Sequence, residues 1–263
     1  MLKKLNRSCI TTKIFNFATM NLAIDVGNTL AKAALFEQNT LKKQIERLDE
    51  QALEYLLAQE KIEKVIISSV NPYSETLANL IPADIDVIKL SYLLPLPIEH
   101  LYQTPQTLGM DRVAVAVGAT ILYPSANRLI IDAGTCVTYD FIDAQNIYHG
   151  GSISLGLQMR FRALHEFTAK LPLLSQADYA EGRSFIGNST QTSMASGVVN
   201  GFVKEIEGFI ELYEEKFGDL QVIFCGGDAA FLSPKVKPKK AKVEHQKDLL
   251  FIGLNTILLY NQF

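Results

Sequence analysis

Two aspartates, each followed two residues later by a glycine, are the residues in this sequence best suited to chemistry. Asp25 opens the run Asp-Val-Gly-Asn-Thr, and Asp132 opens the run Asp-Ala-Gly-Thr. A glycine at such a turn lets a phosphate oxygen approach the backbone, whose N–H groups then point at the anion. The side chains that follow add hydrogen-bond donors: Asn28, Thr29 and Thr135. These residue types predict two phosphate-binding turns.

The same two carboxylates predict a divalent cation. A carboxylate beside a triphosphate is repelled unless a cation lies between them, and Mg²⁺ accepts carboxylate and phosphate oxygens, often through water. We therefore expect Asp25 and Asp132 to lie near magnesium-bound nucleotide. One such turn alone would more often be an ordinary β-turn stabilised by its aspartate. Two copies, each between strand patterns, favour the binding interpretation.

A third motif lies near the C-terminus. Val222–Asp228 reads Val-Ile-Phe-Cys-Gly-Gly-Asp, which is a strand pattern that opens into Gly226 and Gly227. On its own, this glycine pair fits an ordinary strand-to-helix turn equally well. The sequence contains neither a Walker A motif nor a G-x-G-x-x-G motif after a strand, so the competing nucleotide loops are absent from it.

The elements that must position these residues form an internal repeat. Strand patterns flank the first acidic turn at Asn21–Ile24 and Ala31–Phe36, and the second at Arg128–Ile131 and Val137–Ile142. A repeat of strand, acidic turn and strand at so long a spacing predicts two duplicated α/β domains rather than a solenoid. The nucleotide is expected in the cleft between them.

Hydrophobic spacing completes the expected architecture. Helices are expected at Glu50–Glu60, Asp111–Tyr123, Gly156–Lys170, Thr190–Phe217 and Gln246–Tyr260. Further strands are expected at Val65–Val70, Asp86–Leu90 and Leu220–Cys225, and a proline-containing loop at Tyr92–Gln106. The predicted division is a disordered basic extension at 1–19, an N-terminal domain at 20–123 and a C-terminal domain at 124–263.

Composition excludes several classes of partner. Apolar residues make up 48% of the 263 residues, and the net charge of −3 gives no reason to expect nucleic acid or an anionic membrane. No apolar run reaches the roughly 18 residues that a membrane helix needs. The three cysteines indicate a reducing compartment without a disulfide framework, so we expect a cytoplasmic protein.

The stretch Tyr102–Arg112, which reads Tyr-Gln-Thr-Pro-Gln-Thr-Leu-Gly-Met-Asp-Arg, carries a third carboxylate. Gly109 permits a close approach, and Asp111 begins a predicted helix. A carboxylate there can accept the proton of a substrate hydroxyl as it attacks the γ-phosphate of a nucleotide. The alternative is that Asp111 only caps the helix and that Arg112 is a surface cation.

These motifs together resemble a known superfamily. Asp25–Thr29, Asp132–Thr135 and Val222–Asp228 resemble the two phosphate motifs and the adenosine motif of the acetate kinase/sugar kinase/Hsp70/actin superfamily. Tyr102–Arg112 is similar to the Tyr…Pro…Leu-Gly-x-Asp-Arg signature of type III pantothenate kinases, with Met110 in place of a small residue. The resemblance covers nearly all of residues 20–263. It implies two actin-like (ribonuclease H-like) domains and ATP-dependent phosphorylation of pantothenate to 4′-phosphopantothenate, the first step of coenzyme A biosynthesis.

The resemblance also implies roles for individual residues. The expected ATP contacts are Asp25, Val26, Gly27, Asn28, Thr29, Leu30, Ala31, Lys32, Thr135, Gly226 and Gly227. The expected pantothenate contacts are Tyr102, Gly109, Met110, Asp111, Arg112 and Thr190. Asp111 would be the general base, Asp25 would organise Mg²⁺, and Asp132 would hold a monovalent cation, K⁺ or NH₄⁺. The resemblance further implies a homodimer.

Two other functions remain open from the sequence. One is another phosphotransferase of the superfamily, such as a sugar kinase or a polyphosphate hydrolase. The other is a non-catalytic nucleotide-binding regulator of transcription, which would keep the fold without needing Asp111.

The expected helix Thr190–Phe217 has an apolar face formed by Val198, Phe202, Ile206 and Phe209. This face fits either the chain's own core or a dimer interface.

Overall fold

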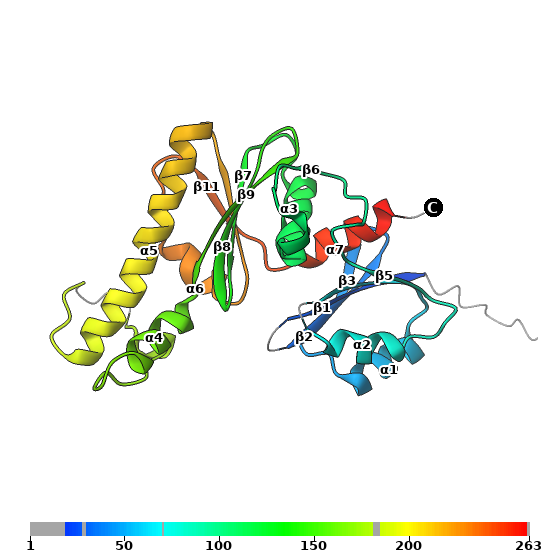
Figure 1. The fold of residues 1–263 in the computed structure, drawn as a ribbon, viewed down its shortest axis with the longest axis horizontal. Coiled ribbons are helices and arrows are strands. Elements are labelled where there is room, and N and C mark those ends of the chain that lie inside the picture. The colour runs from blue at the N-terminus through cyan, green and yellow to red at the C-terminus, as the bar shows by residue number, and fades with distance from the viewer. Residues whose placement is uncertain (1–18, 28–29, 70, 181–184, 262–263) are drawn as a thin grey trace, which may run out of the picture.

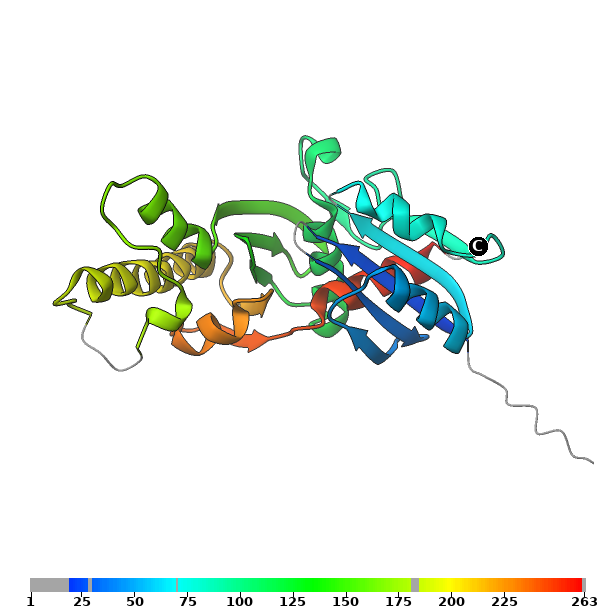
Figure 2. The same cartoon turned by 90° about the horizontal axis from the view of Figure 1, so that it is seen from below.

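The computed structural model describes residues 19–27, 30–69, 71–180 and 185–261, and these form two β-sheets with helices on both (Figures 1 and 2). The predicted extension at 1–19 therefore lies outside the described residues except for its last residue. Within the described ranges, no helix has the length and apolar character required to cross a membrane.

The N-terminal sheet, sheet A, has five strands in the order β3-β2-β1-β4-β5. Its strands are β1 (Met20–Val26), β2 (Ala31–Glu37), β3 (Thr40–Ile45), β4 (Ile62–Ser69) and β5 (Asp86–Lys89). The central strand β1 is antiparallel to β2 and parallel to β4. Helices α1 (Glu50–Gln59) and α2 (Tyr73–Asn79) cover one face, where buried leucines of both helices pack against β1, β2 and β4.

The second sheet, sheet B, repeats this plan in the order β11-β10-β7-β8-β9-β6. Its strands are β6 (Glu99–His100), β7 (Arg128–Ala133), β8 (Cys136–Ile142), β9 (Ile147–Leu155), β10 (Gln221–Cys225) and β11 (Lys242–His245). As in sheet A, the central strand β7 is antiparallel to the next strand of the chain and parallel to the strand on its other side. The predicted duplication is confirmed, because β1 and β7 hold equivalent places.

Helices α4 (Leu157–Glu166), α5 (Thr190–Phe217) and α6 (Ala229–Leu232) lie on the outer face of sheet B (Figure 1). The apolar face of α5 is part of this layer: Val198, Phe202 and Ile206 are buried against β7, β8 and β10. This stripe is therefore committed to the chain's own core, and a dimer interface on α5 must use other residues.

Two helices pack together between the sheets, α3 (Met110–Leu122) and α7 (Leu249–Tyr260). Their backbones touch because each has a glycine at the crossing. A Cβ on Gly253 would lie 1.7 Å from the carbonyl oxygen of Ala114, and a Cβ on Gly118 would lie 2.4 Å from that of Leu249. The C-terminal helix α7 lies on β1, β2 and β4 of sheet A, whereas α3 touches strands of both sheets. The division at residue 123 stays a prediction, and α7 packs across it.

Several elements form where none was predicted. They are β3, α2, β6, β9, α6 and β11, together with short 3-10 turns at Pro105–Thr107, Gln176–Asp178 and Ser233–Lys235. Strand β9 shows the reason, because it contains Gly150 and Gly151, which disfavour a strand locally. In the sheet, the Cβ position of Gly151 is filled by the carbonyl oxygen of Tyr139 at 1.5 Å, so the neighbouring strand requires this glycine. Val70, the predicted end of one strand, lies outside the described residues.

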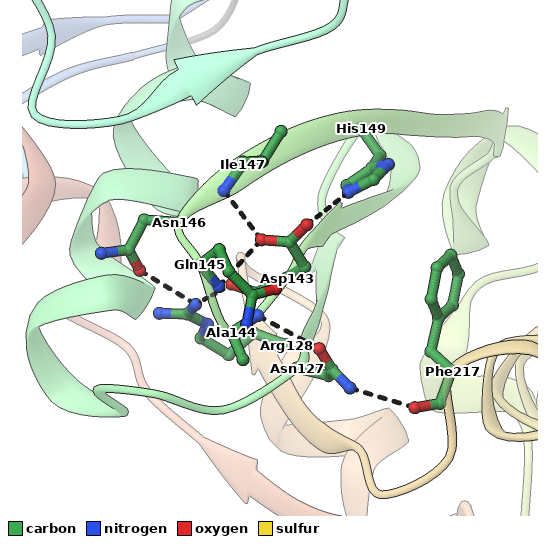
Figure 3. Close-up of polar contacts among 9 residues, drawn as sticks. All are labelled: Asn127, Arg128, Asp143, Ala144, Gln145, Asn146, Ile147, His149 and Phe217. Carbon is green, nitrogen blue, oxygen red and sulfur yellow. Dashed lines mark hydrogen bonds and ion pairs between the residues drawn. The ribbon is translucent and has the colours of Figure 1, made fainter.

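A buried arginine secures one end of sheet B. Arg128 begins β7, is fully buried, and donates hydrogen bonds to the backbone oxygen of Asp143 and to Asn146 at 3.0 Å (Figure 3). The carboxylate of Asp143 in turn lies 2.7 Å from Nε2 of His149, within hydrogen-bonding distance. This network lies at the start of β7, whereas Asp132 lies near the end of the same strand.

Candidate active site

Three motifs that are far apart in the sequence line one cavity between the sheets. Asp25 and Lys32 come from β1 and β2, Asp132 comes from β7, and Gly226 and Gly227 follow β10. The cavity has a volume of about 290 Å³. Because β1 and β7 are the equivalent central strands of two facing sheets, the repeated aspartates meet across this cavity.

Asp25 is partly buried, and Ser68 on the neighbouring strand β4 donates a hydrogen bond to it. The pKa of Asp25 is raised to about 6, chiefly by burial and in smaller part by the nearby negative charge of Asp111. The hydrogen bond from Ser68 and the positive charge of Lys32 act in the opposite direction. The charged form of Asp25 is thus disfavoured in the cation-free protein.

Asp132 shows the same effect more strongly. Its pKa is raised to about 7, chiefly by burial and in smaller part by the charges of Asp111, Asp140 and Asp25. Carboxylates that raise one another's pKa values lie close enough to repel, so a cation among them would be favoured. The arrangement fits Mg²⁺, a hard ion that binds carboxylate oxygens and keeps ligands from phosphate and water. Among the described residues, no cluster of three or more His, Cys, Asp or Glu side chains could hold a metal by itself.

The turn after β10 is shaped around Asp132. Gly226 has a φ of +88°, and a Cβ there would lie 2.3 Å from Oδ1 of Asp132 and 2.5 Å from the carbonyl oxygen of Ala133. The N–H of Asp228 donates to the same carbonyl at 2.9 Å. At Gly227, in contrast, a Cβ would have no neighbour within 4 Å. The first glycine is thus required by protein packing, and the second leaves open space beside the cavity.

The first phosphate turn is held by a residue that the motif does not include. The side-chain amide of Asn71 donates to the carbonyl oxygen of Gly27 at 2.7 Å, and the N–H of Gly27 donates to the carbonyl oxygen of Leu30 at 3.1 Å. These contacts close the turn on both sides of Asn28 and Thr29, which lie outside the described residues.

Not every expected ATP contact reaches the central cavity. Val26, Gly27, Leu30 and Ala31 line a neighbouring hollow that also includes Asn71. Side chains alternate between faces along a strand, so Val26 points into the core of sheet A while Asp25 points into the cavity. The predicted ATP contacts around the first turn therefore line two separate spaces. Asp25 and Lys32 line the central cavity, whereas Val26, Gly27, Leu30 and Ala31 line the neighbouring hollow.

The second turn is supported by the start of α4. The N–H of Gly156, the N-cap of that helix, donates to the carbonyl oxygen of Thr135 at 3.2 Å. A Cβ on Gly156 would lie 2.2 Å from the carbonyl oxygen of Gly134. Thr135 itself is exposed at the tip of the turn. Sequence reasoning missed the role of Gly156, which it placed as the first residue of a predicted helix, whereas Gly156 is the N-cap of α4.

Asp111 lies in the first turn of α3, near both cavity carboxylates. Its negative charge raises the pKa of Asp25 and that of Asp132. Its Oδ1 accepts a hydrogen bond from the backbone N–H of Arg112 at 2.9 Å. A Cβ on Gly109, the N-cap, would lie 2.5 Å from the same oxygen. Glycine at this position therefore gives the Asp111 carboxylate its space.

Arg112 is not a surface cation. It is buried and forms an ion pair with the buried Asp140, with Nη2 2.7 Å from Oδ1. Its Cζ lies 5.8 Å from the centre of the Tyr102 ring, which stacks on Tyr148 at a centroid distance of 6.4 Å. Met110 packs partly buried against the central core. The structure thus gathers the predicted substrate stretch at one place, with Asp140 as a partner that the motifs did not identify.

Thr190 is separated from the other predicted pocket residues. It is the exposed first residue of α5, where Ser189 is the N-cap. The N-terminal half of α5 lies well away from α3 in both views (Figures 1 and 2). Within one chain, Thr190 is therefore not brought together with Tyr102 or Asp111.

The cavity also has lining residues that no motif indicated. They are Gln44, Glu46, Val115, Lys247, Leu250 and Phe251. Lys32 forms an ion pair with Glu46 at 2.9 Å. Gln44 on β3 donates to Asp248 beside α7 at 2.5 Å, which links the rim of sheet A to the central helices. Residues of β3 and α7 thus line the cavity because the chain brings these two elements beside it, which no local sequence pattern indicates.

Gly226→Ala should disturb the fold of this turn, whereas Gly227→Ala should not. Alanine at 226 would clash with Asp132 and would have to adopt a positive φ, at a cost of about 1–3 kcal/mol. We expect a clearly lower melting temperature for Gly226→Ala, measured by thermal melts, and weaker ATP binding, measured by calorimetric titration. Gly227→Ala is the matched control for the fold and should keep a melting temperature near wild type, because a Cβ there meets no protein atom. Equal melting temperatures of the two variants would contradict this account of the turn.

The comparisons with known proteins agree with this geometry. A sequence profile described as type III pantothenate kinase matches residues 21–212. A type III pantothenate kinase from Christiangramia forsetii is 42% identical over 247 residues, covering 92% of this chain and 99% of the relative. One from Phocaeicola vulgatus is 41% identical over 246 residues, again covering 92% of this chain and 99% of the relative.

Solved structures support the fold. A Campylobacter jejuni protein, described provisionally as a Baf family transcriptional activator, superposes with a TM-score of 0.58 at 24% identity and covers 91% of this chain and 98% of its own. Likeness at that identity shows the fold alone. The sequence matches, by contrast, extend over most of the chain at about 40% identity. This chain belongs to the type III pantothenate kinase family.

Proposed function

We propose that this protein transfers the γ-phosphoryl group of ATP to pantothenate, giving 4′-phosphopantothenate in the first step of coenzyme A biosynthesis. The observation that carries the proposal is the convergence of Asp25, Asp132 and Gly226 on one cavity, with Asp111 close to both carboxylates. Membership of the family supplies the substrate.

In this mechanism Asp111 is the general base. Phosphoryl transfer passes through a loose transition state, so the enzyme contributes mainly by positioning and by neutralising charge. Asp111 would accept the proton of the pantothenate hydroxyl as that oxygen attacks the γ-phosphorus. Its place in the first turn of α3, with an open approach over Gly109, leaves the carboxylate accessible to a substrate hydroxyl.

Asp25 and Asp132 would hold the cations that accompany the nucleotide. Mg²⁺ bound near Asp25 would neutralise the charge of the phosphates, and Asp132 would hold K⁺ or NH₄⁺. The protein's own part is to keep the carboxylates in place, through Ser68 for Asp25 and through Gly226 for Asp132. Lys32 lines the same cavity and is the cation of the first turn available to the phosphates.

Pantothenate would bind beside Tyr102 and the segment from Gly109 to Arg112. The aromatic ring of Tyr102 and the guanidinium of Arg112 already lie together.

The two alternative functions would use parts of the same site. A different phosphotransferase would keep the cavity but favour another acceptor, and a regulator would bind nucleotide without turning it over. Phosphate release or product formation with a panel of hydroxyl acceptors separates these outcomes.

The first experiment is turnover of pantothenate by the purified protein, with Asp111→Asn as the test of mechanism. Because a general base contributes about 10²–10⁴-fold, kcat should fall by that factor. Asparagine keeps the shape and can still accept the hydrogen bond from Arg112, so the melting temperature and ATP affinity should stay near wild type. Asp25→Asn should instead weaken binding of Mg·ATP. Near-normal kcat in a folded Asp111→Asn protein would mean that Asp111 is a binding or capping residue.

Cation dependence should be both specific and sensitive to pH. EDTA should abolish turnover, and replacing potassium by sodium should reduce it. Because burial and neighbouring carboxylates raise the pKa of Asp132 to about 7, a cation must displace a proton there at lower pH. Apparent cation affinity, read from thermal shifts, should therefore weaken by up to about tenfold per pH unit below 7 and level off above it. Asp132→Asn should remove this pH dependence. Full turnover in sodium alone would contradict the monovalent site.

We further propose a homodimer in which Thr190 completes the pantothenate pocket of the second copy. Thr190 is separated from Asp111 of its own chain, and an apolar groove of about 860 Å³ lies between α4 and α5. Its lining includes Leu164, Phe167 and Met194, and Phe167 is 84% exposed. Large exposed apolar surface of this kind is typical of an interface.

Light scattering should give twice the chain mass of 29.2 kDa. Phe167→Glu should shift the protein toward a single chain mass and raise KM for pantothenate, because a charge would be buried in the interface. Tyr55→Glu is the control, since Tyr55 is also exposed but lies on α1 of the other sheet. A protein that remains one chain mass at all concentrations would contradict the proposal.

The proposal also includes a cellular compartment and a division into domains. The described cysteines, Cys136 and Cys225, are both free thiols, which supports a reducing compartment such as the cytoplasm. We retain the division into domains at 20–123 and 124–263, with sheet A in the first and most of sheet B in the second.

A further inference from the structure

A fourth aspartate, Asp140 on β8, lies outside every motif of the sequence and is fully buried. Its Oδ1 accepts hydrogen bonds from Nε and Nη2 of Arg112, at 2.9 and 2.7 Å, and from the hydroxyl of Tyr148 at 2.6 Å. Its Oδ2 accepts from the hydroxyl of Thr138 at 2.7 Å. A charge pair removed from water needs such additional partners, because Coulomb attraction alone rarely offsets the loss of hydration. The complete set of donors indicates a cluster with one defined geometry.

Arg112 joins this cluster to the first turn of α3. Its guanidinium is held by Asp140, and its backbone N–H donates to Oδ1 of Asp111 at 2.9 Å. The side chains of Arg112 and Asp140 are 7% and 0% exposed, so solvent does not weaken the pair. The turn that carries Asp111 is therefore tied directly to sheet B.

The other side of the cluster is tied to the strand that carries Asp132. Strands β7 and β8 are antiparallel, and Thr138 lies directly opposite Asp132 in their register. Asp140 thus connects, through Arg112 and Thr138, the first turn of α3, which carries Asp111, to the strand that carries Asp132. Relative placement of this kind matters, because a shift of about 1 Å in a reacting group can cost about 10²-fold in rate.

We propose that Asp140 is a positioning residue for phosphoryl transfer, which acts through its buried ion pair with Arg112 to fix Asp111 relative to Asp132. The inference rests on the proposed function, in which Asp111 is the base. Because Asp140 holds two of the three guanidinium nitrogens, it also sets the direction in which Arg112 faces pantothenate.

Asp140→Asn tests the proposal, since it keeps the size of the side chain and removes its charge. The expected result is a fall in kcat of about 10²-fold from misplacement of Asp111. KM for ATP should change by less than about twofold, because the nucleotide contacts are untouched. A folded Asp140→Asn protein with wild-type kcat would overturn the proposal.

Arg112→Lys supplies a second route to the same measurement. Lysine keeps the positive charge but loses the planar fork that binds one carboxylate through two nitrogens. We expect a comparable loss of kcat, and the double variant should be about as slow as the slower single variant, because both changes break one interaction. Losses that multiply would show that Asp140 acts independently of Arg112, which contradicts the proposal.

Arg128→Lys is the matched control. It alters the other buried arginine of the described residues, which begins β7 and donates hydrogen bonds to Asp143 and Asn146 (Figure 3). Arg128 lies at the opposite end of that strand from Asp132. The substitution should lower the melting temperature but leave kcat within about twofold of wild type, because it lies outside the site. If Arg128→Lys loses kcat as Arg112→Lys does, general loosening explains the effect and the proposal fails.

If Asp140→Asn does not fold, the two lysine variants decide the question, and wild-type kcat in Arg112→Lys overturns the proposal. A wild-type protein that turns over no pantothenate would contradict the proposed function instead, before any variant is compared.

Discussion

Carboxylates that share a poorly hydrated cavity repel one another, and this repulsion is the constraint on which the rest of the site depends. Burial and mutual charge raise the pKa of Asp25 to about 6 and that of Asp132 to about 7. A protein that only needed stability would not keep such groups together. Under the proposed function, a cation that enters the cavity would offset this cost, and cation binding would be coupled to nucleotide binding.

Holding these groups together requires two sheets to face each other at a fixed separation. The helices α3 and α7 set that separation, because Gly118 and Gly253 let their backbones touch. Helix α3 touches both sheets and carries Asp111 in its first turn. Helix α7 lies on sheet A and begins just after Lys247, a residue that lines the cavity. Contacts between the first strand and the last helix hold this arrangement together. One of them is the buried hydrogen bond between Asn21 of β1 and Asn255 of α7, at 3.1 Å.

Many of the supporting residues lie on elements other than those that carry the groups they support. Ser68 reaches Asp25 from β4, Asp140 reaches Arg112 from β8, and Gly156 packs under the second turn from the end of β9. Such supports have no fixed distance in the sequence from the groups they hold, because strand pairing and tertiary packing make them neighbours. Motif reasoning finds the candidate reacting groups but not their supports.

The sequence by itself determined the duplicated plan and most helices, and it supplied the candidate reacting groups. A strand, an acidic glycine turn and a strand form a local pattern, so Asp25, Asp132 and the turn at Gly226 could be found without knowing what lies beside them. The stretch around Asp111 could be assigned in the same way, since it is continuous.

Only the tertiary structure decided where these local units meet. It placed the apolar stripe of α5 in the core of sheet B and turned Arg112 from an apparent surface cation into half of a buried ion pair. It also separated Thr190 from the other pocket residues and formed β9 through two glycines that disfavour a strand locally. The physical reason is the same in each case. Burial, strand register and ion pairing depend on partners distant in the chain, whereas turn and helix chemistry depend on neighbours.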